Sequence, residues 1–248
     1  LPIYFDHYPL SSLKMPEILK NDWDDLPEGA RSLMENSKWF WEGMMKALEE
    51  DPSAWKDYVQ AYQACASFAD DMIGRIIDAL DKSPHKDNTI IVLWSDHGFH
   101  LGEKEHFEKF ALWEKSTHIP FIVIAPGITE PRTVIEKPVD MTTIYPTLAD
   151  LCGLEIPAHT DGFSLVPLLK DTATEIPPAL MTYMKGNHAV RTGRWRYIQY
   201  SDGTEELYDH LTDPHEWYNV AGISKNKIVI EELKKFIPGK NADQVPNL

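Results

Sequence analysis

The sequence is short of cysteines, of basic residues and of long apolar runs, and each shortage argues against a class of protein. Only two of the 248 residues are cysteines, and neither lies in a Cys-x-x-Cys pattern, so neither a disulfide scaffold nor a cysteine-ligated zinc site is expected. Cys65 and Cys152 are instead predicted to be small buried apolar side chains. No apolar run has the length of a membrane span, and the first residues do not have the form of a signal peptide.

Basic residues are outnumbered by acidic ones, with 24 Lys and Arg against 39 Asp and Glu and a net charge of -15. A phosphate-rich surface would repel this charge, so we expect no nucleic-acid partner and no binding to an anionic membrane. A small anionic substrate is still compatible with this negative net charge, since a metal ion or a local cluster of cations makes the potential at a binding site positive.

The sequence also lacks an initiator methionine and starts with LPIYFDHYPL. Such a start is typical of the middle of a chain, and we expect a fragment or a processed product. Residues 1–26 are rich in proline, aromatic and acidic residues, which predicts an extended segment packed over a domain surface.

The order of the elements that follow predicts an α/β fold. Helices are predicted over 28–49 and over 141–151. A further helix is predicted to begin with Asp51 as its N-cap and Pro52 at its first helical position. TIIVLW (89–94) and IPFIVIAPG (119–127) are continuous β-branched runs, as in strands buried on both faces. Helix, strand, long loop, strand and helix predict a sheet flanked by helices.

After Pro178 the pattern changes to short alternating segments: ALMTYM, HAVRTG, RWRYIQY and EELYDH. These segments, separated by turns, predict a small antiparallel sheet, and a terminal helix is predicted over 225–236. We therefore expect two parts, with residues 1–177 in the α/β core and residues 178–248 in a small C-terminal subdomain.

The first predicted strand runs directly into Ser-Asp-His-Gly (95–98), where functional groups gather in open α/β sheets. Asp96 offers a hard oxygen ligand and His97 a neutral imidazole, so together they are half of a candidate metal site. Gly98 would let the chain turn away while both side chains face one cavity. The alternative is that Asp96 caps the turn and His97 is a hydrogen-bonded loop residue.

Lys109 and His106 follow in the same loop. An ammonium group beside a divalent metal would neutralise an oxygen of a bound sulfate or phosphate. His106 would donate to the same anion or take part in proton transfer. On the residues alone, Lys109 also fits a solvated lysine, and His106 fits a structural histidine.

In their order, these segments resemble the C-terminal half of a type I sulfatase of the alkaline-phosphatase-like superfamily, and the resemblance covers nearly the whole chain. The segments that match the family include NTIIVLWSDHGFHLGE, HFEKFALWEKSTHIPFIVIAPG, PVDMTTIYPTLADLCGLEIP and AVRTGRWRYIQY. The iduronate-2-sulfatase-like branch is the most similar, followed by choline-sulfatase-like enzymes. The resemblance implies part of an α/β/α sandwich with a small antiparallel-sheet subdomain at its C-terminus.

The resemblance also implies roles for particular residues. Asp96 and His97 match the second pair of ligands to the family's calcium ion, and Lys109 matches the lysine that contacts the substrate sulfate. His106 is the candidate for the acid that aids the leaving alcohol. The implied activity is hydrolysis of a sulfate ester, on a sulfated carbohydrate, in an extracytoplasmic compartment.

The family's nucleophile, a formylglycine made from Cys-x-Pro-x-Arg or Ser-x-Pro-x-Arg, has no match here. Neither ACASF nor LCGLE fits that motif, and no serine does. The first pair of metal-binding aspartates is missing too, so the resemblance implies an N-terminal half that supplies both. Two alternatives stay open: an inactive sulfatase-like binding or structural module, and a phosphodiesterase or phosphonate monoester hydrolase of the same superfamily.

Six residues are candidates for substrate selection by their position alone. Tryptophan and tyrosine in such places would stack on a sugar ring, although packing explains them equally well. The six are Phe99, His100, Trp113, Tyr183, Asn187 and His188.

Overall fold

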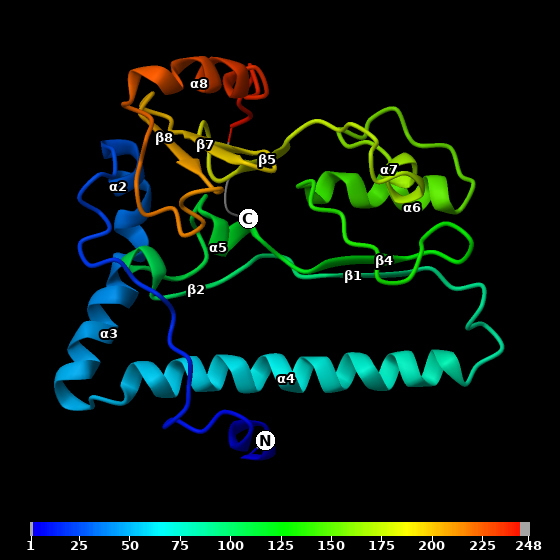
Figure 1. The fold of residues 1–248 in the computed structure, drawn as a ribbon, viewed down its shortest axis with the longest axis horizontal. Coiled ribbons are helices and arrows are strands. Elements are labelled where there is room, and N and C mark those ends of the chain that lie inside the picture. Colours follow the sequence, from blue (N-terminus) through cyan, green and yellow to red (C-terminus); the bar gives the residue numbers. More distant parts are fainter. Residues whose placement is uncertain (1, 244–248) are drawn as a thin grey trace.

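The computed structural model describes residues 2–243 and has the layers of an α/β sandwich. The long helix α4 (Ala54–Asp81) lies along one side of a ribbon formed by β1 (Ile91–Trp94) and β4 (Phe121–Ile124), and α6 (Ile144–Leu151) lies on the other side (Figure 1). The predicted α/β fold class is confirmed. No helix within the described residues is long and apolar enough to cross a membrane.

The helix predicted over 28–49 is confirmed, with one tight turn in its course. The segment consists of α2 (Glu28–Met34), a 3-10 turn and α3 (Lys38–Glu50). The predicted extended segment before it contains a short helix, α1 (Pro2–Asp6), where Tyr4 donates a hydrogen bond to Asp71 of α4 at 2.6 Å.

Helix α4 starts later than the sequence predicts. Its N-cap is Ser53, and the Asp51 carboxylate instead accepts a hydrogen bond from the backbone N–H of Ser53 at 2.8 Å. The prediction of buried cysteines is wrong, since Cys65 and Cys152 are both exposed. Cys65 follows the buried Ala64 and therefore points about 100° further round the helix.

The two strands of the ribbon pair with each other in antiparallel orientation, with Ile91 opposite Ile124 and Trp94 opposite Phe121. The prediction that both strands are buried on both faces is wrong. Trp94, Ile122 and Ile124 are 43–48% exposed. Because successive side chains alternate between the faces of a strand, the face of β4 that carries Phe121 and Val123 is half-buried and the other face is open.

The helix predicted over 141–151 is confirmed. It begins as a 3-10 turn at Met141–Thr143, continues as α6 and ends before Gly153, whose φ of 67° closes the helix as predicted. A short helix, α7 (Val166–Lys170), packs against α6.

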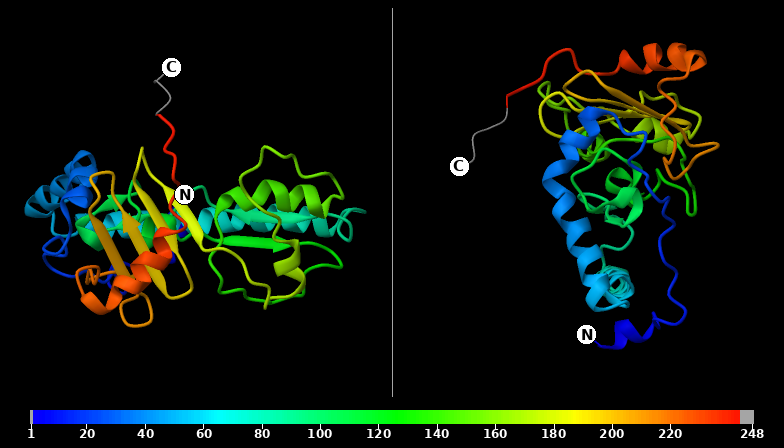
Figure 2. Two further views of the ribbon diagram at one scale, coloured as in Figure 1. Left: turned by 90° about the horizontal axis from the view of Figure 1, so that it is seen from above. Right: turned by 90° about the vertical axis from the view of Figure 1, so that its left-hand side faces the viewer.

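The predicted small antiparallel sheet is also confirmed. Its four strands lie in chain order: β5 (Ala179–Thr182), β6 (His188–Arg191), β7 (Trp195–Gln199) and β8 (Glu205–Asp209). The predicted terminal helix forms as α8 (Lys227–Lys234) after a 3-10 turn, and it lies over this sheet (Figure 2).

Each face of the C-terminal sheet contributes to a different hydrophobic cluster. On the α8 side, Tyr197 and Leu207 pack with residues of that helix, including Leu233. On the other side, Ile198 and Tyr208 pack with α2 and with residues 111–113 of the long loop. The boundary predicted between residues 177 and 178 stays a prediction, and residues 244–248 lie outside the described part.

Candidate functional site

The predicted site residues lie in the long segment between β1 and β4. Within it, β2 (His100–Leu101) and β3 (Phe107–Glu108) form a small hairpin, and α5 (Glu114–Thr117) leads on to β4. We call residues 100–110 the lysine loop, because Lys109 lies near its end.

Aromatic side chains hold the lysine loop against α3 and α4. Phe107 is fully buried, and its ring lies 5.3–5.9 Å, between centroids, from the rings of Phe40, Trp41, Trp55 and Tyr58. Trp55 also donates its indole N–H to the carbonyl of Leu101 at 2.7 Å. These contacts leave the loop little freedom to shift as a whole.

Asp96, His97 and Lys109 come together although twelve residues separate the pair from the lysine. The Lys109 Nζ atom lies 2.8 Å from the Nε2 atom of His97, and that nitrogen is 3.4 Å from the Asp96 carboxylate. The other ring nitrogen of His97, Nδ1, donates to the carbonyl of Gly98 at 2.7 Å. This bond fixes the tautomer and leaves the Nε2 lone pair to Lys109 or to a metal ion.

Gly98 is required here for a different reason from the one predicted. Its φ is not in the left-handed region, so it does not serve a sharp turn. Instead its N–H donates to the carbonyl of Ser116 at 2.8 Å, and a Cβ atom would overlap the carbonyl oxygen of Lys115. Glycine thus lets the end of β1 lie directly against α5.

Asp96 and His97 fit a half-site for a divalent cation. The Asp96 side chain is 81% exposed, and that of His97 is 31% exposed, so the carboxylate and the imidazole are accessible from one side. A carboxylate oxygen suits calcium, while an imidazole is a less usual ligand for it. A cation taking up the Nε2 lone pair would also displace the Lys109 ammonium toward a bound anion.

The His106 side chain is buried beneath this site. Its Nε2 atom donates to the carbonyl of Lys109 at 2.6 Å, and its ring packs edge-on against His100, with centroids 5.0 Å apart. Burial lowers the pKa of His106 and lowers that of His100 further. The structure thus connects His106 to the backbone of Lys109, while its role as the acid stays a prediction.

The lysine loop has a strained backbone. Lys104, Glu105, Glu108 and Phe110 have φ values of 60°, 48°, 69° and 68°, in the left-handed region that non-glycine residues avoid at about 1–3 kcal/mol each. Such a backbone persists only where side-chain contacts determine it. Lys109 lies between two of these residues in the sequence, Glu108 and Phe110.

Lys104 supplies one set of those contacts, although its side chain is only 2% exposed. Its Nζ atom donates to the Asp22 carboxylate at 2.8 Å and lies 4.8 Å from the ring centroid of Tyr208. Burial raises the pKa of Asp22 to about 6, and the attraction of Lys104 opposes this rise. The second oxygen of Asp22 has no partner among the described residues.

Glu206 extends this buried polar network into the C-terminal sheet. Its carboxylate accepts hydrogen bonds from Trp113, Tyr200 and Tyr208 at 2.6–2.8 Å. Burial raises the pKa of Glu206, while Lys104 acts in the opposite direction. The network joins the N-terminal segment, the lysine loop and the β5–β8 sheet.

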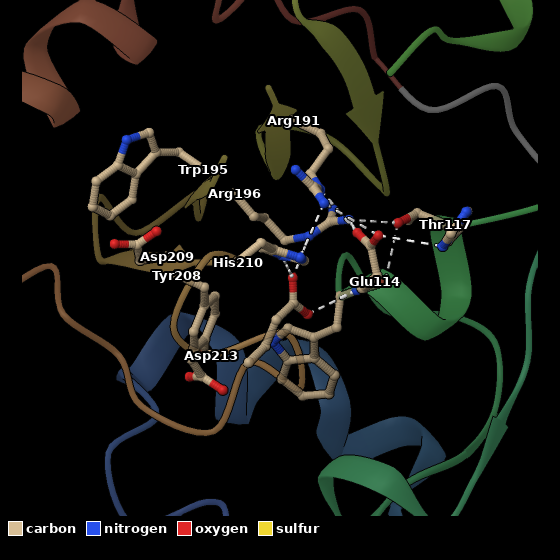
Figure 3. Close-up of polar contacts among 12 residues, drawn as sticks. Glu114, Thr117, Arg191, Trp195, Arg196, Tyr208, Asp209, His210 and Asp213 are labelled. Carbon is tan, nitrogen blue, oxygen red and sulfur yellow. Dashed lines mark hydrogen bonds and ion pairs between the residues drawn. The ribbon is translucent and has the colours of Figure 1, made fainter. Parts of the chain in front are cut away.

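A second ion-pair network fixes the start of α5 (Figure 3). Arg196, 1% exposed, donates to Glu114 and, at 2.5 Å, to Glu216, and Arg191 donates to Glu114 at 3.0 Å. Glu114, His210 and Glu216 also have the spacing of a metal site. The two guanidinium groups already neutralise these carboxylates, so this cluster does not fit a divalent cation.

Most of the six candidates for substrate selection are buried. His100, Trp113, Asn187 and His188 are at most 5% exposed. Phe99 stacks on Tyr62, with centroids 5.1 Å apart. Tyr183 lies 6.0 Å from Phe110, again between ring centroids.

Comparison with known proteins identifies the family to which the chain belongs. The chain matches the family model described as Sulfatase over residues 14–154, and the model described as N-sulphoglucosamine sulphohydrolase, C-terminal, over residues 102–243. The chain belongs to the sulfatase family.

Two relatives give the extent of the similarity. A sulfatase from Formosa agariphila is 44% identical over 242 residues, which cover 96% of this chain and 46% of that protein. Arylsulfatase K from Rattus norvegicus is 35% identical over 176 residues, 64% of this chain and 31% of that protein. The chain thus spans less than half the length of these relatives.

Solved structures show the same fold. A protein in complex with its substrate D-glucosamine-2-N,6-O-disulfate matches with a TM-score of 0.65 and 28% identity, over 73% of this chain and 40% of that one. A phosphonate monoester hydrolase from Silicibacter pomeroyi matches with a TM-score of 0.76 and 22% identity, over 94% of this chain and 51% of that one. The latter likeness concerns the fold alone.

Proposed function

We propose that this chain supplies part of the active site of a sulfate-ester hydrolase that acts on a sulfated carbohydrate in an extracytoplasmic compartment. The observation that carries the proposal is the convergence of Asp96, His97 and Lys109 at the end of β1 in a chain of the sulfatase family. One structural relative was solved in complex with its substrate, a sulfated glucosamine. This supports a sulfated sugar as the substrate here.

In this proposal Asp96 and His97 hold a calcium ion, whose charge would stabilise the sulfate oxygens when it is bound. Lys109 binds a sulfate oxygen, because its ammonium already lies beside the metal ligands and carries the positive charge that a developing anion needs. His106 is the candidate acid, and its hydrogen bond to the Lys109 carbonyl connects it with the site.

The nucleophile, a formylglycine, is proposed to lie on a segment outside these 248 residues. No Cys-x-Pro-x-Arg or Ser-x-Pro-x-Arg motif occurs in the sequence, and the relatives are more than twice as long as the matched part. Placement in the iduronate-2-sulfatase-like branch is part of the same proposal, since the matching relatives carry the broader names sulfatase and arylsulfatase K.

Two variants of the protein expressed from its native gene separate the roles of metal and lysine. Asp96→Ala should lose calcium affinity in a calorimetric titration, together with release of sulfate from a sulfated glucosamine. Lys109→Ala should keep its calcium affinity but lose sulfate release by about 100-fold, as expected when one donor to a developing anion is removed.

Lys82→Ala is the matched control, because Lys82 is exposed at the far end of α4. It should retain both calcium affinity and turnover. Near-normal turnover in Lys109→Ala would mean that Lys109 is an ordinary solvated lysine. Unchanged calcium affinity in Asp96→Ala would mean that Asp96 is not a calcium ligand.

A further inference from the structure

We infer that Lys104, paired with Asp22, is a positioning residue: it holds the lysine loop in the strained conformation that presents Lys109 to the sulfate. This inference rests on the proposed function of Lys109. It adds a residue that touches neither metal nor sulfate and acts through the backbone five residues away.

The first observation is the burial of a charge in a loop. The side chains of Lys104 and Asp22 are 2% and 1% exposed, and their charged atoms lie 2.8 Å apart. Removing two charges from water carries a large desolvation cost, and a buried pair is often no more stable than apolar residues of the same size. The pair is therefore better explained by the geometry it imposes than by the stability it adds.

The second observation is that the pair acts on the backbone as well as the side chains. Lys104 itself has a φ of 60°, and its carbonyl accepts the indole N–H of Trp23 at 2.6 Å. The backbone N–H of Asn21 donates to the side chain of Glu105 at 2.9 Å. Residues 21–23 thus contact the loop at three consecutive points, with the ion pair between the two hydrogen bonds.

The third observation is the short path from Lys104 to Lys109. His106 is two residues beyond Lys104, and its ring donates to the Lys109 carbonyl. The same hairpin turn is closed by a hydrogen bond from the N–H of Gly102 to the carbonyl of His106, 3.0 Å long. Lys104 therefore lies in the same hairpin turn as the ring that holds the Lys109 backbone, and the Lys109 Nζ atom lies 2.8 Å from the Nε2 atom of His97.

The test removes both charges at once, because Lys104→Met alone would leave a buried, unpaired carboxylate and strongly destabilise the fold. Asp22→Asn/Lys104→Met keeps the shapes of both side chains without either charge, and we expect it to fold. Inorganic sulfate is the probe, with its affinity measured by calorimetry in the presence of calcium. Hydrogen exchange of peptides covering residues 100–110 reports on the loop itself.

We expect the double variant to bind sulfate at least tenfold more weakly, to exchange faster over residues 100–110, and to keep wild-type calcium affinity. Lys234→Met is the control, because it removes a lysine whose Nζ lies 2.7 Å from Glu205 on the far side of the C-terminal sheet, and it should change none of these readouts. Wild-type sulfate affinity and unchanged exchange in a folded double variant would overturn the inference.

A failure of the proposed function gives a different result. If Lys109→Ala binds sulfate as tightly as the wild type, Lys109 does not contact the anion, and the function proposed for it fails. If Lys109→Ala loses sulfate while the double variant keeps it, the proposed function stands and the positioning role of Lys104 fails.

Discussion

At the scale of single residues, Glu114 shows how two opposing effects set a pKa. Burial alone would raise the pKa of its carboxyl group, but the Arg196 and Arg191 guanidinium groups outweigh burial and lower that pKa from 4.5 to about 2. A carboxylate with a lowered pKa stabilises the fold fully above pH 4.5, and its contribution is lost as the pH falls toward 2. A shift of this size corresponds to about 3 kcal/mol.

Glu114→Gln should therefore unfold more easily at neutral pH, by about 3–5 kcal/mol, because it leaves buried guanidinium groups without their partner. Its unfolding free energy should also fall less steeply than that of the wild type between pH 4.5 and pH 2. Urea denaturation across this pH range measures both effects. Glu49→Gln, which changes an exposed glutamate in α3, should follow the wild-type curve, and an identical acid slope in Glu114→Gln would contradict the account.

The residues of the site were only partly predictable from the sequence. Asp96 and His97 follow a strand directly, so their position at its end could be predicted, and the resemblance to sulfatases pointed to Lys109. Nothing local in the sequence distinguishes the buried Lys104 from the exposed Lys115 of α5, because the partner of Lys104, Asp22, lies 82 positions away. The buried arginine Arg196 was missed for the same reason.

At the scale of elements, helix and strand patterns predicted the positions of α2, α3, α4, α6 and the four strands of the C-terminal sheet. The errors lie in burial and in element boundaries. The apolar runs of β1 and β4 predicted strands buried on both faces, yet composition does not say which strands pair. In the described residues β1 and β4 pair only with each other, which leaves Ile122 and Ile124 exposed.

The contact between the end of β1 and α5 can be tested with one methyl group. Gly98→Ala would drive a Cβ atom into the carbonyl of Lys115, and because backbone is displaced on both sides we expect a loss of at least about 2 kcal/mol. Urea denaturation gives the value, and calcium affinity should fall with it because His97 is adjacent.

Gly74→Ala is the matched control inside α4. A Cβ atom there meets no atom within 4 Å, so alanine should raise the unfolding free energy by about 0.5–1 kcal/mol through helix propensity. If the two substitutions had equal effects, close approach at Gly98 would not be the reason for its glycine.

At the scale of the whole molecule, the lysine loop and α5 are anchored to the rest of the described chain. Two buried polar networks, centred on Lys104 with Glu206 and on Arg196 with Glu114, join the lysine loop and α5 to the C-terminal sheet. The sequence contains no Cys-x-Pro-x-Arg or Ser-x-Pro-x-Arg motif, and therefore no nucleophile of the sulfatase type. The central claim is therefore that a formylglycine on another segment completes the site.

Mass spectrometry of the intact and digested protein, purified after expression from its native gene, decides whether such a segment exists. We expect a peptide with the Cys-x-Pro-x-Arg or Ser-x-Pro-x-Arg motif, on the same chain or on a cleaved companion, with its first residue converted to formylglycine. A purified protein that begins at Leu1 and is accompanied by no such peptide would contradict the proposal of sulfate-ester hydrolysis.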